Sequence, residues 1–438
     1  TIVLALACTH TTDYLRFYIL DLSGNDLESL SLLPHVAGVA HQHDTEKIAR
    51  IIDEVCGFID QPEPRHTFLI VDGWHVLHGD HEDLMEKLGR IVADGLAARV
   101  HLVLTATRWS VVRPAIRDLI PQRIETKLGE PMDSLIDRKA QLKVPALPGR
   151  GLTSSGETML IALSAQQDVA FIARSLVADQ PPVPQLKLLP ISLMLADLPQ
   201  LDPEQNSVLL GVGGPKLGAV NWDYLASQHI VCIGAQESGK STLISTIIAG
   251  LTQIGRERAR LIVIDHRRSH LGAIDPDMLA GYSASTQETE KLVAAMKITL
   301  EERLPSAEVT PQQLKDRSWW TGPDIFLIVD NLDLVADMAF APLLSVLPHA
   351  RDVGLHVVIT RKSGGCVRAL FQPFLAEIKD QSPFIIVLDA DKDDGPLFGV
   401  RLKPQPPGRG VMIHHGTQQG LIQIAAADMP EVAEAKAS

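Results

Sequence analysis

The chain has 438 residues, and at about 150 residues per domain this length predicts two or three domains. Its composition is 45% hydrophobic but only 4% aromatic, which favours alternating helices and buried parallel strands over an all-β sandwich and argues against a disordered chain. With a formal net charge of −13 the molecule as a whole repels phosphate backbones, so we expect no nucleic-acid partner.

The four cysteines lie far apart and form no C-x-x-C pair, which argues against a zinc site and fits reduced thiols in a cytosolic compartment. No apolar run approaches the roughly 18 residues that a membrane-spanning helix needs. The sequence starts without Met and shows no signal-peptide pattern, so we expect it to be a piece of a longer protein.

Much of the sequence occurs twice, in the same order. The run FLIVD, an apolar strand-like segment that ends in an acid, stands at residues 68–72 and again at 326–330. Four further segments recur around it. Their paired ranges are 17–21 with 261–265, 45–48 with 289–292, 101–105 with 356–360, and 147–151 with 406–410. Five matches in one order predict two copies of one domain.

The first copy starts late in the domain. Both Asp21 and Thr45 lie 244 positions before their counterparts, Asp265 and Thr289. The first copy's equivalent of the phosphate-binding loop described below would therefore precede the sequence. Residues 1–9, TIVLALACT, are predicted to be the rest of the helix that follows such a loop.

A Pro-rich stretch separates the two copies. Residues 179–204 are predicted to be a linker, because Pro continues neither a helix nor an interior strand. Residues 1–178 are predicted to be a degenerate or N-terminally truncated ATPase domain, and residues 205–438 a domain with an intact phosphate loop. The expected fold class is α/β, with two tandem P-loop NTPase domains of the RecA type whose mainly parallel sheets are covered by helices.

The segment VCIGAQESGKSTL at residues 231–243 fits the phosphate-binding pattern G-x-x-x-x-G-K-[ST]. A predicted strand precedes it and a predicted helix follows, as the pattern requires. Backbone N–H groups of such a loop approach the α- and β-phosphates, Lys240 reaches the β- and γ-phosphates, and the Ser241 hydroxyl can ligate Mg²⁺. ATP and Mg²⁺ are therefore the predicted cofactors. The nucleotide-binding residues predicted in the loop are Gly234, Ala235, Gln236, Glu237, Ser238, Gly239, Lys240, Ser241 and Thr242.

Asp330 ends the second FLIVD segment and is the predicted Walker B acid, which would hold Mg²⁺ through water. Hydrolysis usually needs an adjacent carboxylate to polarise the attacking water, but the next residue is Asn331, which is no useful base at neutral pH. Asp333 is the alternative catalytic carboxylate. In the first copy Asp72 is followed by Gly73. We therefore expect both copies to be catalytically compromised, with nucleotide binding and slow hydrolysis in the second.

Other residues of the second copy stand at strand ends and turns. Asp265 is predicted to lie near the phosphates or an adjacent subunit, and the alternative is a solvated turn. Thr360 is predicted to sense the γ-phosphate, and the alternative is an ordinary capping hydroxyl. Trp319 and Trp320 are predicted to pack a connecting turn onto the core, and the alternative is an interface or ligand-recognition surface. Arg351 is a candidate to complete the site of a neighbouring subunit.

Several phrases together resemble one family. They are ARDVGLHVVIT at residues 350–360, RSWW at 317–320, LPHVAGV at 33–39, PGRG at 407–410 and the two FLIVD segments. Over nearly the whole chain they resemble the second and third ATPase domains of the EccC family, the FtsK/SpoIIIE-type ATPases of mycobacterial type VII (ESX) secretion systems. The resemblance identifies both copies as FtsK-like domains.

The resemblance also implies partners and a location. In that family a membrane segment and a more active first ATPase domain precede these two domains, and the ATPase assembles with other subunits as a hexamer beneath an inner-membrane channel. The last ATPase domain recognises the C-terminal signal of small helical-hairpin WXG-type substrates. The implied place of this chain is the cytoplasmic side of the inner membrane, as a soluble part of the secretion complex whose membrane contact comes through another region or a partner chain.

Three functions stay open at this point. The first is an ATP-binding motor and regulatory component of type VII secretion that recognises and helps to export WXG-type substrates. The second is an FtsK-like DNA translocase, against which the net charge of −13 and the absence of a DNA-reading winged-helix tail weigh. The third is a pseudo-ATPase scaffold that binds partners and never hydrolyses ATP.

Overall fold

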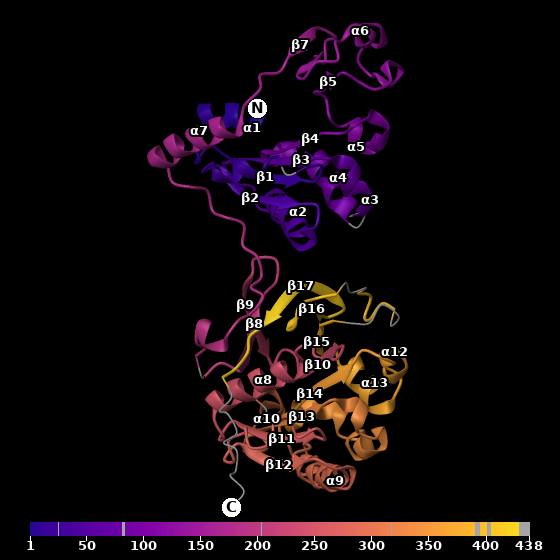
Figure 1. The fold of residues 1–438 in the computed structure, drawn as a ribbon. Helices are drawn as coiled ribbons and strands as arrows, with labels where there is room; N and C mark the ends of the chain where they lie inside the picture. Colours follow the sequence, from indigo (N-terminus) through magenta and orange to yellow (C-terminus); the bar gives the residue numbers. More distant parts are fainter. Residues whose placement is uncertain are drawn as a thin grey trace, which may run out of the picture. The chain divides into compact units, whose positions relative to one another are not determined.

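The computed structural model describes residues 1–24, 26–80, 84–202, 204–316, 318–389, 395–400 and 404–428. The chain divides into two compact units, residues 1–188 (unit 1) and 189–438 (unit 2), which Figure 1 colours in sequence order. The division falls inside the stretch 179–204 that the sequence predicts to be a linker, of which residue 203 lies outside the described residues.

Unit 1 is built on a four-stranded parallel sheet with the strand order β2-β1-β3-β4. These strands are β1 (Leu15–Asp21), β2 (Val36–His41), β3 (His66–Asp72) and β4 (Val100–Leu104). The helices are α1 (Ile2–Thr9), α2 (Thr45–Asp60), α3 (Trp74–Asp80), α4 (Met85–Asp94), α5 (Pro114–Arg117), α6 (Arg138–Lys143) and α7 (Gln166–Asp179). The helix predicted over residues 1–9 is thus present as α1.

Two apolar cores cover the two faces of this sheet. Side chains alternate along β1, so Tyr18 and Leu20 face a core formed with α2 and α4, whereas Phe17 and Ile19 face a core formed with α1 and α7. Every residue of β1 is buried, as expected for a parallel strand covered by helices on both faces.

A second sheet of unit 1 is antiparallel, with the order β5-β6-β7. Its strands are β5 (Glu125–Thr126), β6 (Arg150–Leu152) and β7 (Thr158–Leu160). The buried Glu125 carboxylate accepts hydrogen bonds from Trp109 Nε1, Ser134 Oγ and the Leu135 N–H. Burial raises the pKa of Glu125, but these donors outweigh burial and hold the pKa below its ordinary value. The charged carboxylate therefore organises the turns around this small sheet.

Unit 2 is built on a ten-stranded sheet with the order β12-β11-β13-β14-β10-β15-β16-β17-β8-β9. The first six strands in this order are parallel, and the remaining four continue the sheet as antiparallel strands. The strands are β8 (Ser207–Gly213), β9 (Gly218–Asp223), β10 (His229–Gly234), β11 (Ala259–Asp265), β12 (Leu279–Ser283), β13 (Asp324–Asp330), β14 (Leu355–Lys362), β15 (Phe384–Val387), β16 (Arg409–His414) and β17 (Thr417–Ile424).

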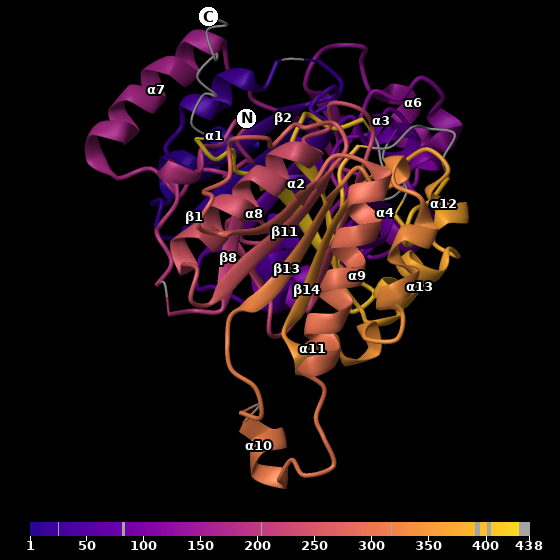
Figure 2. The same cartoon turned by 90° about the horizontal axis from the view of Figure 1, so that it is seen from below.

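The helices of unit 2 cover both faces of its parallel strands. They are α8 (Lys240–Ile254), α9 (Thr286–Glu302), α10 (Pro311–Asp316), α11 (Ala350–Val353), α12 (Cys366–Ala369) and α13 (Pro373–Asp380), with the short 3₁₀ helices η6 (Leu195–Asp197), η7 (Leu332–Leu334) and η8 (Asp337–Leu343) among them. Figure 2 shows α8 and α9 on opposite sides of β11, β13 and β14. Because both faces are covered, β10, β11 and β13 read as nearly continuous apolar runs.

The two units repeat one arrangement. The order β2-β1-β3-β4 of unit 1 corresponds to β12-β11-β13-β14 of unit 2, and the two FLIVD segments occupy β3 and β13. The predicted α/β fold with parallel-rich sheets is therefore confirmed. The repeat changes beyond β4 and β14. In unit 2, β15 to β17 join the main sheet through β10, whereas β5 to β7 of unit 1 form a sheet of their own.

The backbone of the Pro-rich stretch is bound to protein on each side of the division. Within unit 1, the N–H groups of Val183 and Leu186 donate to carbonyl groups in and just before β2. Within unit 2, the buried guanidinium of Arg409 donates to the carbonyl oxygens of Leu189 (3.0 Å) and Pro190 (2.7 Å).

His229, at the start of β10, is a buried and neutral histidine. Its Nδ1 accepts the N–H of Val357, and its Nε2 donates to Oε1 of Gln381. Burial lowers the pKa of His229 from 6.5 to about 3. Between these values the unfolded chain binds a proton that the folded chain does not, so the free energy of unfolding falls as the pH falls.

We predict that the free energy of unfolding falls by about 2 kcal/mol more in the wild-type chain than in His229→Gln when the pH changes from 7 to 5. Urea denaturation at both pH values measures the two losses, and comparing them removes the contribution of the other titrating groups. Equal losses in the two proteins would contradict the assignment of a buried neutral ring.

Candidate nucleotide-binding site

The loop between β10 and α8 depends on glycine. Strand β10 ends at Gly234, and α8 begins at Lys240. Gly239 has a φ of +102°, in the left-handed region that favours glycine. A Cβ atom on Gly239 would lie 2.7 Å from the backbone N of Gly408 and 2.9 Å from its Cα. Both the turn and the close approach of a second backbone therefore require a residue without a side chain.

The same loop is held by neighbouring backbone and keeps one hydroxyl unpartnered. The Ala235 N–H donates to the Asp389 carbonyl (2.7 Å), and the Gly408 N–H donates to the Ser238 carbonyl (2.8 Å). The Ser238 hydroxyl is buried and has no hydrogen-bond partner within the described part of the chain. Such a group costs about 1–3 kcal/mol if nothing satisfies it, so its position fits a loop that closes around a polar ligand.

Lys240 folds back over the loop that precedes it. Its ammonium donates to the carbonyl oxygens of Gly234 (3.0 Å) and Ala235 (2.5 Å), and the residue is only 8% exposed. Burial lowers the pKa of Lys240, while the nearby Asp330 carboxylate opposes the shift. The cation thus lies at the N-terminus of α8, where backbone N–H groups add positive potential for an anionic ligand.

Asp330 and Thr360, near the carboxyl ends of β13 and β14, come together with Ser241 at the N-terminus of α8. The Thr360 hydroxyl donates to Oδ1 of Asp330 (2.5 Å), and the Ser241 hydroxyl donates to Oδ2 (3.2 Å). Thr360 also accepts the N–H of Asn331 (2.8 Å). Burial raises the pKa of Asp330, but the surrounding donors, with His270 first among them, outweigh burial and lower it. The carboxylate is therefore ionised at neutral pH and available to a cation.

Asp265 is buried rather than part of a solvated turn. It is the register partner of Asp330 on the neighbouring strand, and it is 0% exposed. Its Oδ2 accepts the hydroxyl of Tyr282 (3.0 Å) and the N–H of His270 (2.8 Å). Asp265 therefore anchors the loop after β11, and its contact with a nucleotide stays a prediction.

The two residues considered for water activation lie just after β13. Asn331 has a φ of +58°, and Oδ1 of Asp333 accepts the N–H of Lys362 at the end of β14 (3.1 Å). Asp333 therefore ties two strand ends together, and its catalytic role stays a prediction. Among the remaining predicted loop residues, Gln236 and Glu237 are exposed and Thr242 is half-buried.

His270 is a residue of this site that the sequence did not indicate. It is 2% exposed, and its Nε2 lies 3.4 Å from Oδ2 of Asp330. No spacing rule connects His270 to the phosphate loop or to the Walker B strand, because the turn after β11 decides where its ring lies. The order of β11 and β13 in the sheet would have been the only useful signal.

Unit 1 retains a similar arrangement around Asp72. The Thr105 hydroxyl donates to Oδ1 of Asp72 (2.6 Å) and accepts the N–H of Gly73 (3.0 Å), and the hydroxyl of Ser23 donates to Oδ2. This repeats the contacts among Asp330, Asn331 and Thr360 in unit 2. The phosphate-loop pattern itself occurs once in the sequence, in unit 2.

Trp319 and Trp320 pack a connecting turn. Their Nε1 groups donate to the carbonyl oxygens of Arg303 (2.7 Å) and Asp352 (2.8 Å), and the Arg303 guanidinium lies 4.2 Å from the Trp320 ring centroid. Residue 317 of the same motif lies outside the described residues.

Arg351 precedes β14, so it stands at the opposite edge of the sheet from the phosphate loop of its own chain. Any contribution of Arg351 to a phosphate site would have to be made to another subunit.

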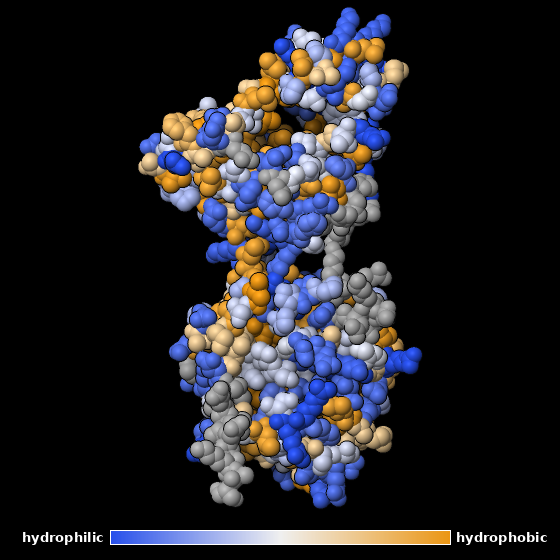
Figure 3. All heavy atoms as spheres, viewed as in Figure 1, coloured by the Kyte–Doolittle hydropathy of each residue, from blue (hydrophilic) through white to orange (hydrophobic). Residues whose placement is uncertain are grey.

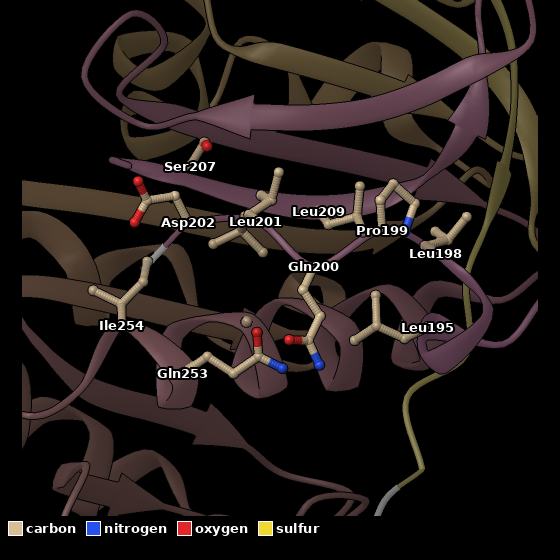
Figure 4. Close-up of a pocket in the computed structure, with 12 residues that line it drawn as sticks. Leu195, Leu198, Pro199, Gln200, Leu201, Asp202, Ser207, Leu209, Gln253 and Ile254 are labelled. Carbon is tan, nitrogen blue, oxygen red and sulfur yellow. The ribbon is translucent and has the colours of Figure 1, made fainter. Parts of the chain in front are cut away.

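A small cavity lies beside the far end of α8 (Figure 4). It is lined by residues 195 and 198–202 of the Pro-rich region, by residues 207–209 of β8, and by Gly250, Gln253 and Ile254 of the helix. Its volume of about 50 Å³ is too small for a nucleotide. The candidate site is the phosphate loop at the other end of α8, because Lys240, Ser241 and Asp330 meet there.

Comparisons with known proteins cover both units. The FtsK/SpoIIIE family matches residues 1–170. The ESX secretion system protein EccC of Thermomonospora curvata is 36% identical over 97% of this chain and 36% of its own length. The ESX-4 secretion system protein EccC4 of Mycobacterium tuberculosis is 34% identical over 98% of this chain and 37% of its own length.

A solved structure extends this similarity to three dimensions. It contains ATPases 2 and 3 of Thermomonospora curvata EccC in complex with a signal sequence peptide. It is 34% identical to this chain with a TM-score of 0.83, and the similarity covers 97% of this chain and 85% of that one. The chain belongs to the EccC family of FtsK/SpoIIIE-type ATPases. The family predicted from the sequence is thus confirmed, and membership in this P-loop ATPase family implies nucleotide binding.

The chain spans a little over a third of the length of the first EccC relatives that it matches. None of the helices in the described part of the chain has the length and apolar character needed to cross a lipid bilayer.

We predict that Gly239→Ala lowers both ATP affinity and the free energy of unfolding. The added Cβ would meet the backbone of Gly408 and hold alanine at a positive φ, a combination that costs more than the about 1–3 kcal/mol of strain alone. Calorimetric titration and urea denaturation measure the two losses. The matched control is Gly255→Ala, since Gly255 has a φ of +92° but nothing within 4 Å of the added Cβ. Equal destabilisation in the two variants would show that contact with Gly408 is unimportant.

Proposed function

We propose that this chain is the nucleotide-binding and substrate-recognising part of an EccC-type ATPase in type VII (ESX) secretion, spanning its second and third ATPase domains. The observation that carries the proposal is the grouping of Lys240, Ser241, Asp330 and Thr360 around the phosphate loop of unit 2. The similarity of the whole chain to ATPases 2 and 3 of Thermomonospora curvata EccC supports it.

Mg²⁺-ATP is the proposed ligand of unit 2. The Ser241 hydroxyl and the Asp330 carboxylate offer the oxygen atoms that Mg²⁺ prefers, and Mg²⁺ is usually held by one or two protein groups together with phosphates and water. The described residues contain no group of three or more His, Cys, Asp or Glu side chains that could hold a metal by themselves, which fits such an open site. When bound, the ion would neutralise charge on the β- and γ-phosphates.

Slow hydrolysis follows from the residues beside Asp330. The Lys240 ammonium would exchange its two carbonyl partners for phosphate oxygens, so the chain provides binding and charge neutralisation. A well-placed general base is the weak component, because Asn331 cannot accept a proton and the alternative carboxylate, Asp333, has its Oδ1 engaged by the Lys362 N–H. Unit 2 therefore serves better as a nucleotide-dependent switch than as a fast motor.

The substrate surface that we propose is a group of exposed apolar side chains of unit 2. The group consists of Leu334 (42% exposed), Met338 (77%), Val367 (47%) and Phe371 (79%). The Asp333 bond to Lys362 places η7 beside the end of β14, which leads into α12. On the face drawn in Figure 3, apolar groups are interspersed with hydrophilic ones. An apolar face of a helical signal segment of a WXG-type substrate matches this chemistry, since amphipathic helices bind exposed apolar surfaces.

The proposed assembly is a hexamer with other subunits of the secretion complex on the cytoplasmic side of the inner membrane. Membrane contact would come from another region of the protein or from a partner. In such a ring the exposed Arg351 could reach the phosphate site of the next subunit, which fits its place at the sheet edge opposite its own loop.

Two alternative functions predict different DNA binding and different assembly. A DNA translocase would bind duplex DNA tightly and with strong salt dependence, whereas the net charge of −13 opposes this. A scaffold that never uses ATP would assemble independently of nucleotide. Filter binding with duplex DNA at two salt concentrations, and assembly measured with and without ATP, separate these from the secretion ATPase.

Lys240→Ala is expected to weaken binding of Mg²⁺-ATP by about a hundredfold, because it removes a buried cation from the phosphate site. Calorimetric titration of the whole chain measures the affinity and the number of sites. Lys297→Ala is the matched control, since Lys297 makes only an exposed helix pair with Glu301. Unchanged affinity in Lys240→Ala would rule out the phosphate loop as the binding site.

Phe371→Ser is expected to weaken the binding of a synthetic WXG-type signal peptide by at least about tenfold, because exposed aromatic anchors dominate such interfaces. Fluorescence anisotropy of the labelled peptide measures the affinity. Ile298→Ser, at a 60% exposed position on α9, is the control and should bind like the wild type. Equal affinities in all three proteins would place the substrate surface elsewhere.

A further inference from the structure

His270 is a buried side chain that points at the Walker B carboxylate. The Nε2 atom of its ring lies 3.4 Å from Oδ2 of Asp330. This nitrogen makes no hydrogen bond of good geometry with any described residue. Buried ring nitrogens in a protein interior normally have a partner. The group nearest to this nitrogen is the Asp330 carboxylate, and a small shift of that carboxylate would complete a hydrogen bond, so the position points to Asp330 as the partner of His270.

The backbone around His270 fixes where the ring lies. The His270 N–H donates to the carboxylate of Asp265, which also accepts the Tyr282 hydroxyl. Asp265 is in register with Asp330 on the adjacent parallel strand. The turn from Asp265 to His270 includes Arg268, which has a φ of +60° and whose N–H donates to the Asp265 carbonyl. Strand register and this anchored turn together place the His270 ring beside the Asp330 side chain.

The oxygen that His270 faces is also the one that Ser241 uses. Thr360 holds Oδ1 of Asp330, whereas Oδ2 has the Ser241 hydroxyl at 3.2 Å and His270 Nε2 at 3.4 Å. A Ser241 hydroxyl that ligates Mg²⁺ uses an oxygen lone pair for the ion and can keep its hydrogen on Oδ2. When the His270 ring carries hydrogen on Nε2, this carboxylate oxygen has two donors, Ser241 and His270.

We propose that His270 is a positioning residue of the Mg²⁺-nucleotide site, which together with Ser241 holds the Asp330 carboxylate in place beside the ion. This inference rests on the proposed nucleotide binding by unit 2. His270 does not touch the phosphates in this role. It should therefore affect the part of nucleotide affinity that depends on Mg²⁺ and leave the rest unchanged.

The test compares the wild-type chain, His270→Leu and His270→Gln by calorimetric titration with a non-hydrolysable ATP analogue, once with Mg²⁺ and once with EDTA. We expect His270→Leu to weaken binding about tenfold with Mg²⁺ and not at all with EDTA. His270→Gln keeps an N–H donor and should recover part of the loss. His266→Ala is the matched control, because His266 lies on the same turn and its Nε2 contacts Thr289 instead.

The outcomes separate the inference from the proposed function. Binding by His270→Leu that equals the wild type under both conditions would overturn the role of His270 and leave nucleotide binding intact. An equal loss with Mg²⁺ and with EDTA, accompanied by a lower melting temperature, would show that His270 only supports the loop and would also overturn it. No binding by the wild-type chain in either condition would overturn the proposed function and the role of His270 with it.

Discussion

The parallel register of β11, β13, β14 and β10 is the constraint on which the site of unit 2 depends. Parallel strands end at the same edge of a sheet, and here the register pairs Asp265 with Asp330 and aligns Thr360 beside the latter. The phosphate loop leaves the same edge because β10 joins β14. Side chains as distant in the sequence as Ser241 and Asp330, which are 89 positions apart, thus meet without any direct link in sequence.

The apolar content of these strands enforces that register. A shift by one residue would move every side chain of a strand to the opposite face, and both faces are packed against helices. Burial also sets the electrostatics of the site. It disfavours charge on both Lys240 and Asp330, and the ionised carboxylate persists because hydroxyl and ring donors surround it. A nucleotide with its cation would complete a site whose charged groups are already oriented.

Strongly patterned features could be predicted from the sequence. FLIVD, the glycine-rich loop and the tandem copies all follow from local composition and spacing. They single out Lys240, Ser241, Asp330 and Thr360, which the structure brings close to one another. His270 could not be predicted, because its place depends on a turn whose geometry comes from tertiary hydrogen bonds. The contact of Gly408 with Gly239 joins loops that are 169 positions apart in the sequence. The need for glycine at position 239 is the only sign of this contact in the sequence. The alternation of strands and helices also does not indicate which sheet a strand joins. In unit 2, β15 to β17 belong to the main sheet, whereas β5 to β7 of unit 1 form a separate sheet.

The buried Arg409 directly follows Gly408 in the chain, and these two neighbours contact different parts of unit 2. The backbone of Gly408 lies close to Gly239 of the phosphate loop. The Arg409 guanidinium donates to the carbonyl oxygens of Leu189 and Pro190, the first two residues of unit 2. One peptide unit therefore joins the rim of the nucleotide pocket to the place where the chain enters the unit. Because Arg409 is also the first residue of β16, the same contact ties the entering chain to the main sheet as well as to the phosphate loop.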